Sequence, residues 1–130
     1  MKIIKVVAAI IKKDNDILIA QRLKGEFAGQ WEFPGGKIEP NETPQEALKR
    51  ELMEEMELPI KVNDFLLTVE HNYSTFHLSM DCFMCELESE QIILHDHSAI
   101  KWISLHDDMK AIDWVPADID VINKVIKTYA

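Results

Sequence analysis

Three glutamates lie close together in the sequence, at spacings that put them on one side of a helix. Glu51, Glu54 and Glu55 stand at positions i, i+3 and i+4, which fall within roughly a 100° arc at about 100° per residue. Such carboxylates repel one another, and a hard divalent cation such as Mg²⁺, which takes oxygen ligands and shares them with substrate phosphates, offsets the repulsion. A solvated acidic face gives the same pattern and is the commoner meaning of a glutamate-rich helix. The spacing alone therefore leaves both interpretations open.

The helix that carries these carboxylates has a well-specified start. Thr43 can accept a backbone hydrogen bond as the N-cap residue, Pro44 suits the first helical position, and Glu46 can complete a capping box. An apolar stripe runs beside the carboxylates and consists of Leu48, Leu52 and Met56. We therefore expect one flank of the helix to pack against a core while the adjoining flank presents the three carboxylates.

The glutamates belong to a longer pattern that resembles the Nudix box. Its positions, in order, are Gly36, Glu42, Arg50, Glu51, Leu52, Glu54 and Glu55. The resemblance implies a Nudix hydrolase, in which the three glutamates bind Mg²⁺ or Mn²⁺ that catalyses hydrolysis of a nucleoside diphosphate linked to another group. Arg50 is then expected to hold Glu42 or one of the box glutamates in place.

One position departs from the box, because Glu57 stands where the family usually has glycine. Glycine there supplies the left-handed backbone conformation that ends a helix, and a glutamate in that conformation costs about 1 kcal/mol. The departure affects the expected end of the helix and leaves the expected metal ligands unchanged.

The residues that precede the box suit a phosphate site. Gly35 and Gly36 let the backbone approach a ligand closely. Lys37 adds a point charge, and Arg22 offers a bidentate fork. Gln-Arg followed by Trp-Glu-Phe-Pro-Gly-Gly-Lys resembles the MutT-type branch of the Nudix family. This implies that Arg22 and Lys37 contact phosphates and that Gly36 lends its carbonyl group to the metal.

Further candidate site residues lie outside the box. Glu32 and Phe33 belong to the MutT-like segment and are assigned to substrate binding, although Phe33 can equally be part of the core. Asp96 lies about six positions before Trp102, where several MutT-type sequences have an acidic residue that binds metal or assists the attacking water. Asp118 follows Val-Pro-Ala, where the resemblance implies a residue that reads the base. From its position near a helix start, Asp118 is most simply a cap or a dipole partner.

Length and charge limit the possible functions. With 130 residues and 47% hydrophobic content, the chain fits one domain, residues 1–130. No apolar run approaches the roughly 20 residues of a membrane span, and the start lacks the cleavage site of a signal peptide, so a cytoplasmic location is the default expectation. A net charge of −9 argues against binding to nucleic-acid polymers or anionic membranes. The expected partner is a small-molecule nucleotide, bound by a monomer or homodimer.

Cysteine and histidine patterns favour packing over metal chemistry. Cys82 and Cys85 have C-x-x-C spacing within an apolar run that resembles a strand, where residues three apart point to opposite faces. We therefore expect two buried thiols and no disulfide. His71 and His77 lack a second ligand at metal spacing, and the His-Asp-His segment at residues 95–97 is too unspecific to indicate a metal triad.

The order of elements predicts an α/β (α+β) fold. The expected strands are Ile3–Ile11, Ile17–Ala20, Ile60–Val69, Phe76–Leu87 and Ala99–Ile103, and a second helix is expected from Ile119 to about Tyr129. The continuous apolar character of the first strands favours cover on both faces. This pattern fits a mixed β-sheet between helices, which is also the three-layer α/β/α sandwich that the Nudix resemblance implies.

The combined prediction is a Mg²⁺-dependent nucleoside triphosphate pyrophosphohydrolase that releases a nucleoside monophosphate and pyrophosphate. The Val-Pro-Ala-Asp-Ile and His-Asp-His stretches look most like CTP pyrophosphohydrolase relatives of MutT, and 8-oxo-dGTP sanitising enzymes share nearly all of these features. Two alternatives stay open. One is a dinucleoside-polyphosphate hydrolase, because Tyr73 lies near a tyrosine position of those enzymes. The other is a non-catalytic nucleotide sensor, although such modules usually lose the box glutamates that this chain keeps.

Overall fold

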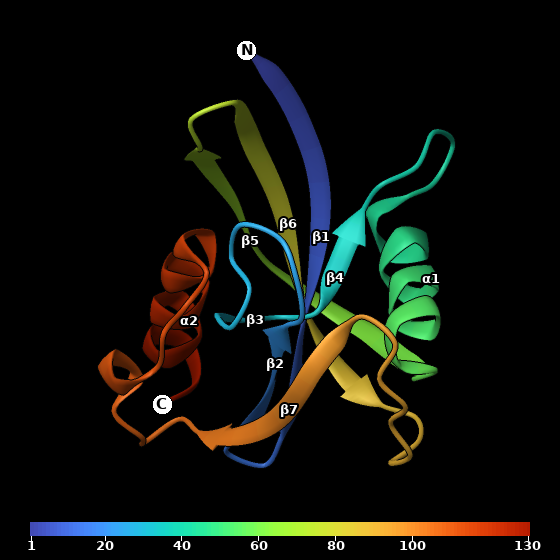
Figure 1. The fold of residues 1–130 in the computed structure, drawn as a ribbon. Helices are drawn as coiled ribbons and strands as arrows, with labels where there is room; N and C mark the ends of the chain where they lie inside the picture. The colour runs from blue at the N-terminus through green and yellow to red at the C-terminus, as the bar shows by residue number, and fades with distance from the viewer.

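Figure 1 shows the computed structural model, which describes residues 1–130. The strands are β1 (Lys2–Lys13), β2 (Asp16–Arg22), β3 (Trp31–Glu32), β4 (Gly35–Lys37), β5 (Ile60–Asn72), β6 (Phe76–Leu87) and β7 (His97–Ser104). The helices are α1 (Pro44–Met56), one 3₁₀ turn (Met109–Ala111) and α2 (Pro116–Tyr129). None of the helices has the length and apolar character that crossing a membrane requires. The order agrees with the prediction, except that the short strands β3 and β4 were not expected.

The rest of the sheet is built on β1. This strand pairs in parallel with β6 along most of its length, and its middle pairs antiparallel with β4. Only its last residues, Lys12 and Lys13, pair with β2. From there β2 continues to β3 on one side and β7 on the other, while β5 lies beyond β6. A single long strand therefore connects the group that contains β4, β6 and β5 to the group that contains β2, β3 and β7.

The two long helices cover opposite sides of these strands, as Figure 1 shows. Side chains alternate along β1, so that Ala8 and Ile10 belong to the core beneath α2, whereas Val7 and Ala9 belong to the core beneath α1. The apolar run of β1 is thus covered on both faces, as predicted. The three-layer arrangement follows from this double cover.

The sequence signals at both ends of α1 are present in the structure. Thr43 Oγ1 accepts a hydrogen bond from the Glu46 N–H at 3.1 Å, and Glu46 Oε1 accepts one from the Thr43 N–H at 2.8 Å. At the other end, Glu57 adopts φ 49° and ψ 37°, in the left-handed region. Its carboxylate lies 2.6 Å from His95 Nε2. The helix therefore ends as the box predicts, with a glutamate in a conformation that glycine adopts at lower cost.

The second helix starts earlier than predicted. It begins at Pro116, because the fixed φ of proline suits the first helical position, and not at Ile119. Val115 is the N-cap residue, and no side chain caps the helix. Asp118 instead lies within the first turn and is only 3% exposed. Of the two roles expected from its position, a cap or a dipole partner, the cap is therefore wrong, whereas its place in the first turn is the one that a dipole partner needs.

The two cysteines behave as the strand pattern predicts. Both are buried free thiols. Cys82 packs in the core beneath α2 and Cys85 in the core beneath α1, so they point to opposite faces of β6. Burial raises the pKa of the Cys85 thiol to about 12, which leaves it protonated and unreactive at neutral pH.

Candidate active site

The two glycines of β4 lie against β1 and against Glu51. Gly35 pairs with Ala8, and Gly36 pairs with Val7. A Cβ atom at position 35 would lie 1.9 Å from the Val7 carbonyl oxygen, whereas one at position 36 would lie 2.3 Å from Cδ of Glu51. Gly35 therefore lets the two strands approach each other, and Gly36 lets the Glu51 carboxylate rest against the backbone of β4.

Alanine at these two positions is expected to have different effects. In Gly36→Ala the new Cβ meets the end of a flexible side chain, so Glu51 moves aside and kcat falls about a hundredfold with little change in thermal stability. In Gly35→Ala it meets backbone atoms, so the free energy of unfolding falls by about 2 kcal/mol or more. Thermal unfolding measured beside kcat separates the two effects. A Gly36→Ala protein with full activity would show that the Glu51 position does not matter.

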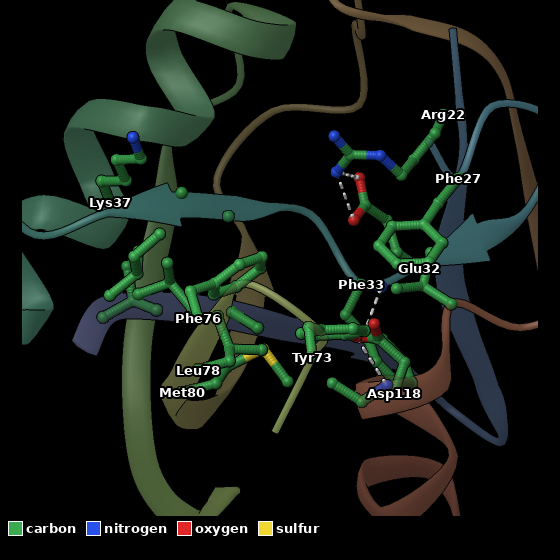
Figure 2. Close-up of a pocket in the computed structure, with 18 of the residues that line it drawn as sticks. Arg22, Phe27, Glu32, Phe33, Lys37, Tyr73, Phe76, Leu78, Met80 and Asp118 are labelled. Atoms are coloured by element: carbon green, nitrogen blue, oxygen red, sulfur yellow. Dashed lines mark hydrogen bonds and ion pairs between the residues drawn. The ribbon is translucent and has the colours of Figure 1, made fainter. Parts of the chain in front are cut away.

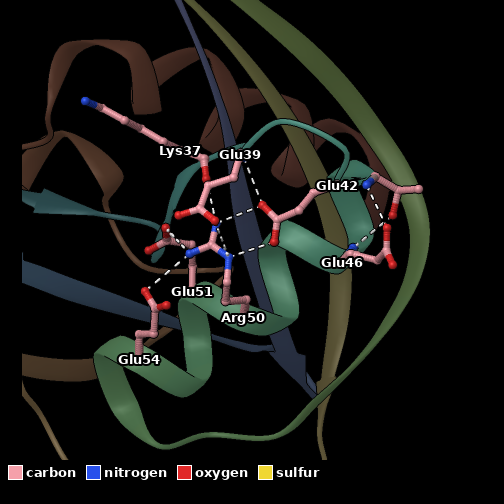
Figure 3. A network of polar contacts seen from close by, with 8 residues as sticks. Lys37, Glu39, Glu42, Glu46, Arg50, Glu51 and Glu54 are labelled. Atoms are coloured by element: carbon pink, nitrogen blue, oxygen red, sulfur yellow. Dashed lines mark hydrogen bonds and ion pairs between the residues drawn. The ribbon is translucent and has the colours of Figure 1, made fainter.

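Arg50, in the middle of α1, joins the box residues (Figure 3). Its guanidinium donates two hydrogen bonds to Glu42, of 2.7 and 2.9 Å, and one of 2.9 Å to the Lys37 carbonyl oxygen. Nη1 donates to Glu51 at 2.9 Å and to Glu54 at 3.3 Å. The hydrogen bond from Arg50 holds the pKa of Glu42 below its usual range. Arg50 therefore contacts both kinds of partner that the sequence suggested, Glu42 and the box glutamates.

Glu55 has the most strongly shifted carboxyl of the box. Its Oε2 atom is buried and has no hydrogen-bond partner. Burial, reinforced by the negative charges of Glu51, Glu32 and Asp96, raises the pKa of Glu55 to about 9. A bound cation would stabilise the charged form of such a carboxyl.

The segment before β7 brings Asp96 to this cluster. The His95 N–H donates to the Glu55 carbonyl oxygen at 2.9 Å, and the Ile93 N–H donates to the Met56 carbonyl oxygen at 3.0 Å. Asp96 itself is exposed, and its charge is one of those that raise the pKa of Glu55. The segment is therefore hydrogen-bonded to the end of α1, and Asp96 lies near enough for its charge to act on Glu55.

The donor set of this cluster fits a divalent metal ion. Its side-chain donors are carboxylate oxygens, which Mg²⁺ and Mn²⁺ prefer, and one of them, Glu55 Oε2, has no partner. In the structure, no three His, Cys, Asp or Glu side chains converge closely enough to hold one ion; Glu51 and Glu54 instead accept hydrogen bonds from Arg50. Arg50 uses only one oxygen of each of these carboxylates, Oε1 of Glu51 and Oε2 of Glu54, so the other oxygen of each can bind an ion while Arg50 holds the side chain.

One pocket of about 380 Å³ is lined by Glu55 of this cluster and by the start of α2 (Figure 2). Glu55 and Gly36 contribute to its lining from the box, and Asp118 contributes from α2. Much of the wall is apolar and comes from β1 and β6, with Ile4, Val6, Phe76, Leu78 and Met80. The volume lies in the usual range for a small-molecule site.

Both predicted phosphate-binding cations line this pocket, and Figure 2 shows them on opposite sides of the view. Arg22 Nη1 lies 3.0 and 3.3 Å from the two carboxylate oxygens of Glu32. The Arg22 Nε atom is buried and has no partner. Lys37 is exposed. Glu32, a predicted substrate-binding residue, therefore contacts Arg22 in the structure.

Asp118 is a buried acid in the pocket wall. Its Oδ1 atom accepts a hydrogen bond of 3.2 Å from the Phe33 N–H. Burial, together with the negative charge of Glu32, raises the pKa of Asp118 well above its usual value. Beside it, the Tyr73 hydroxyl accepts a hydrogen bond of 3.2 Å from the Ala117 N–H, which ties the end of β5 to α2.

Phe33 has both of the roles that the sequence left open. Its side chain is 3% exposed and belongs to the core beneath α2, where its ring stacks on Trp114 with centroids 5.5 Å apart. It also lines the pocket. One face of the ring therefore packs against Trp114 in the core, and another part of the residue borders the cavity.

Sequence reasoning missed two residues at this site. Phe27 lines the pocket and packs against Tyr73, with ring centroids 5.2 Å apart; its glycine-containing loop gives no periodic signal. His97 is buried, and its Nε2 atom lies 2.9 Å from Glu32 Oε2. The His-Asp-His segment was the only signal for His97, and it does not indicate a contact with Glu32.

Comparisons with known proteins identify the family of this chain. The NUDIX domain model matches residues 1–125. The chain belongs to the Nudix family. It is 36% identical over 123 residues to the CTP pyrophosphohydrolase of Escherichia coli K12, covering 94% of this chain and 90% of the relative. It is 46% identical over 76 residues to the 8-oxo-dGTP diphosphatase of Proteus vulgaris, covering 58% of this chain and 68% of the relative.

Solved structures of similar proteins have the same fold. The solution structure of the E. coli ORF135 protein matches with a TM-score of 0.85 at 34% identity, over 100% of this chain and 93% of that one. The structure of MutT from Staphylococcus aureus matches with a TM-score of 0.75 at 40% identity, over 98% and 99% of the two chains. The predicted family, fold class and enzyme class, a hydrolase of phosphoric anhydrides, are confirmed. Nudix hydrolases generally need divalent metal ions.

Proposed function

We propose that this Nudix hydrolase is a divalent-metal-dependent pyrophosphohydrolase of nucleoside triphosphates, with CTP and dCTP as its preferred substrates. The products are the nucleoside monophosphate and pyrophosphate. The observation that carries the proposal is the pocket, whose lining includes both Glu55 of the box and the buried acid Asp118. A nucleotide with its phosphates at Glu55 has its base within reach of Asp118. The activity named for the E. coli relative supports the same substrate class.

The glutamate cluster serves the phosphates. Mg²⁺ or Mn²⁺ would be held by Glu51, Glu54 and Glu55, together with the Gly36 carbonyl group and Asp96. When bound, the ion would neutralise negative charge on the phosphates and lower the pKa of a water molecule. Asp96 either completes the ligand set or takes a proton from the attacking water.

Other residues bind and orient the substrate. Arg22 and Lys37 supply positive charge for the phosphate oxygens. Arg50 holds Glu51 and Glu54 beside the pocket through the hydrogen bonds described above. The aromatic rings of Phe27 and Phe33 offer apolar surface to a base.

Asp118 in its neutral form complements cytosine. A protonated carboxyl group donates one hydrogen bond and accepts another, which matches N3 of cytosine as an acceptor and its 4-amino group as a donor. An ionised carboxylate only accepts, which matches the N1–H and 2-amino donors of guanine and 8-oxoguanine. The raised pKa of Asp118 therefore favours cytosine.

A second candidate is an 8-oxo-dGTP diphosphatase, which the 46% identity to the P. vulgaris relative favours. A panel of CTP, dCTP, 5-methyl-dCTP, 8-oxo-dGTP, ADP-ribose and diadenosine tetraphosphate, each with Mg²⁺, ranks the substrates by kcat/KM. We expect the cytidine nucleotides to rank first. First rank for 8-oxo-dGTP supports the second candidate, and first rank for diadenosine tetraphosphate supports the alternative based on Tyr73. Hydrolysis of none would contradict the proposal.

Asp118→Asn tests how the base is read. Asparagine presents a donor and an acceptor at every pH, so dCTP remains a substrate while kcat/KM for 8-oxo-dGTP, relative to dCTP, falls about tenfold. In the wild type, the preference for dCTP over 8-oxo-dGTP falls as pH rises, because Asp118 with its raised pKa loses a proton in that direction. In the variant this preference is independent of pH. A variant whose preference varies with pH as in the wild type would exclude Asp118 as the base-reading group.

A further inference from the structure

We propose that His97 is a positioning residue of the nucleotide pocket, which fixes the Glu32 carboxylate and, through it, Arg22. The inference rests on the proposed function, because it concerns the same site. His97 does not line the pocket. It acts on the substrate only through Glu32 and Arg22, which both line the pocket.

The contact between His97 and Glu32 is buried. The His97 side chain is 3% exposed and the Glu32 side chain 16% exposed, and the His97 Nε2 to Glu32 Oε2 distance is 2.9 Å. The other ring nitrogen, Nδ1, is buried without a partner. The contact to Glu32 is therefore the one hydrogen bond of this ring. Packing alone does not explain an imidazole here, because burying a polar group lowers stability unless it is hydrogen-bonded.

A β-bulge turns His97 towards Glu32. The register between β2 and β7 goes from Gln21 opposite Ala99 directly to Arg22 opposite His97, so Ser98 has no partner. In a regular register Ser98 would stand opposite Arg22, and His97 would point to the other face of the sheet. Bulges commonly re-aim a side chain beside a functional site. The irregularity lies at the point where His97 meets Arg22.

Glu32 needs more than one donor where it lies. It comes from β3, opposite Ala20 of β2, and its charge acts on both Glu55 and Asp118. A carboxylate this close to two other acids keeps its charge more easily when hydrogen-bond donors stabilise it. Arg22 and His97 are the two side chains that donate to it.

Removing His97 leaves Arg22 as the only side-chain donor to Glu32. The Arg22 side chain is 41% exposed, so it keeps more rotamer freedom than a buried ring and holds Glu32 less firmly. Glu32 and Arg22 are then free to adopt other rotamers. A phosphate-binding arginine that must be ordered on binding lowers affinity without altering the chemical step. The expected signature is therefore a change in KM and not in kcat.

The test compares His97→Leu with His97→Gln, because the glutamine amide can place a donor where the histidine has Nε2. With the best nucleotide of the panel, His97→Leu raises KM about tenfold and changes kcat by less than about threefold, whereas His97→Gln restores most of the affinity. Equal losses in both variants would overturn the proposal. The matched control is His77→Leu, which removes a partly exposed histidine 2.6 Å from Glu70 Oε2 and leaves KM unchanged.

A double-mutant cycle with Glu32→Gln identifies the route of the effect. If His97 acts through Glu32, the changes in kcat/KM of His97→Leu and Glu32→Gln do not add in the double variant. Additive changes would show that His97 acts elsewhere. Thermal unfolding of each variant identifies any that fail to fold. If His97→Leu does, His97→Asn takes its place, because the shorter amide cannot place a donor at the Nε2 position; a KM equal to that of His97→Gln would then overturn the proposal.

Binding separates this proposal from the proposed function. The dissociation constant of the α,β-methylene analogue of CTP, with Mg²⁺, is measured by calorimetry for the same variants. A wild type that binds the analogue but cleaves no nucleotide contradicts the proposed function alone, and about tenfold weaker binding by His97→Leu still supports the positioning role. Unchanged binding by His97→Leu overturns that role. A wild type that neither binds nor cleaves overturns both.

Discussion

Replacing Glu55 by glutamine is expected to lower kcat for CTP by about a thousandfold or more. The amide cannot supply negative charge at the position where the Glu55 Oε2 atom is buried without a partner in the pocket wall. The measurement is kcat at saturating CTP over a titration of Mg²⁺. Glu88→Gln, which changes an exposed glutamate, is the matched control and keeps full activity. A Glu55→Gln protein with undiminished kcat would remove Glu55 from the catalytic cluster.

The same substitution is expected to stabilise the metal-free protein. The folded pKa of Glu55 is about 9, raised from 4.5 chiefly by burial. Between these values the unfolded chain releases a proton that the folded protein keeps, so the free energy of unfolding falls as pH rises from about 4.5 to about 9. At pH 7 this loss is about 3 kcal/mol.

Thermal unfolding across pH measures this effect. With a chelator present, wild type and Glu55→Gln have similar Tm at pH 5, and the variant has the higher Tm at pH 8. Mg²⁺ raises the Tm of the wild type more than that of the variant, because binding restores a partner to the ionised carboxylate. If the two metal-free proteins showed the same pH dependence of Tm, Glu55 would not be the buried acid described here.

Arg50→Lys is expected to lower kcat/KM about a hundredfold. Lysine keeps the charge but cannot reproduce the planar fork that binds Glu42 through two hydrogen bonds while Nη1 reaches Glu51 and Glu54. The half-saturating concentration of Mg²⁺ rises as well, because two of these carboxylates are the proposed metal ligands.

A neighbouring residue serves as the control for Arg50→Lys. Lys49→Arg makes the reverse exchange at an exposed position of the same helix. It is expected to leave kcat/KM and the half-saturating concentration of Mg²⁺ unchanged. Glu42→Gln, which removes the counter-ion of Arg50, is expected to reduce activity through the same contact, so its effect and that of Arg50→Lys do not add. Full activity of Arg50→Lys would show that charge alone is sufficient and that the fork geometry has no role.

Features that depend on neighbouring residues were predictable from the sequence. The start of α1 is determined by Thr43, Pro44 and Glu46, which interact with one another within a single turn. The end of α1 was predictable as well, because the box pattern alone indicated a residue in the left-handed conformation at Glu57. The continuous apolar run of β1 likewise predicted a strand covered on both faces.

Features that depend on tertiary structure were not predictable. The burial of Asp118 follows from the early start of α2 and from the contact with Phe33, a residue far away in the sequence. The contact between His97 and Glu32 depends on a bulge at Ser98, which no local pattern indicates. The resemblance to the MutT branch brought Arg22, Glu32 and Asp118 into consideration, but their common pocket appears only when the strands are assembled.

The products formed from CTP show directly whether this protein is a pyrophosphohydrolase. Phosphorus NMR of a reaction with wild-type protein and Mg²⁺ distinguishes the two possible cleavages of the triphosphate. We expect CMP and pyrophosphate in equal amounts, and unchanged CTP when Glu55→Gln replaces the wild type. CDP and inorganic phosphate as the products would contradict this expectation.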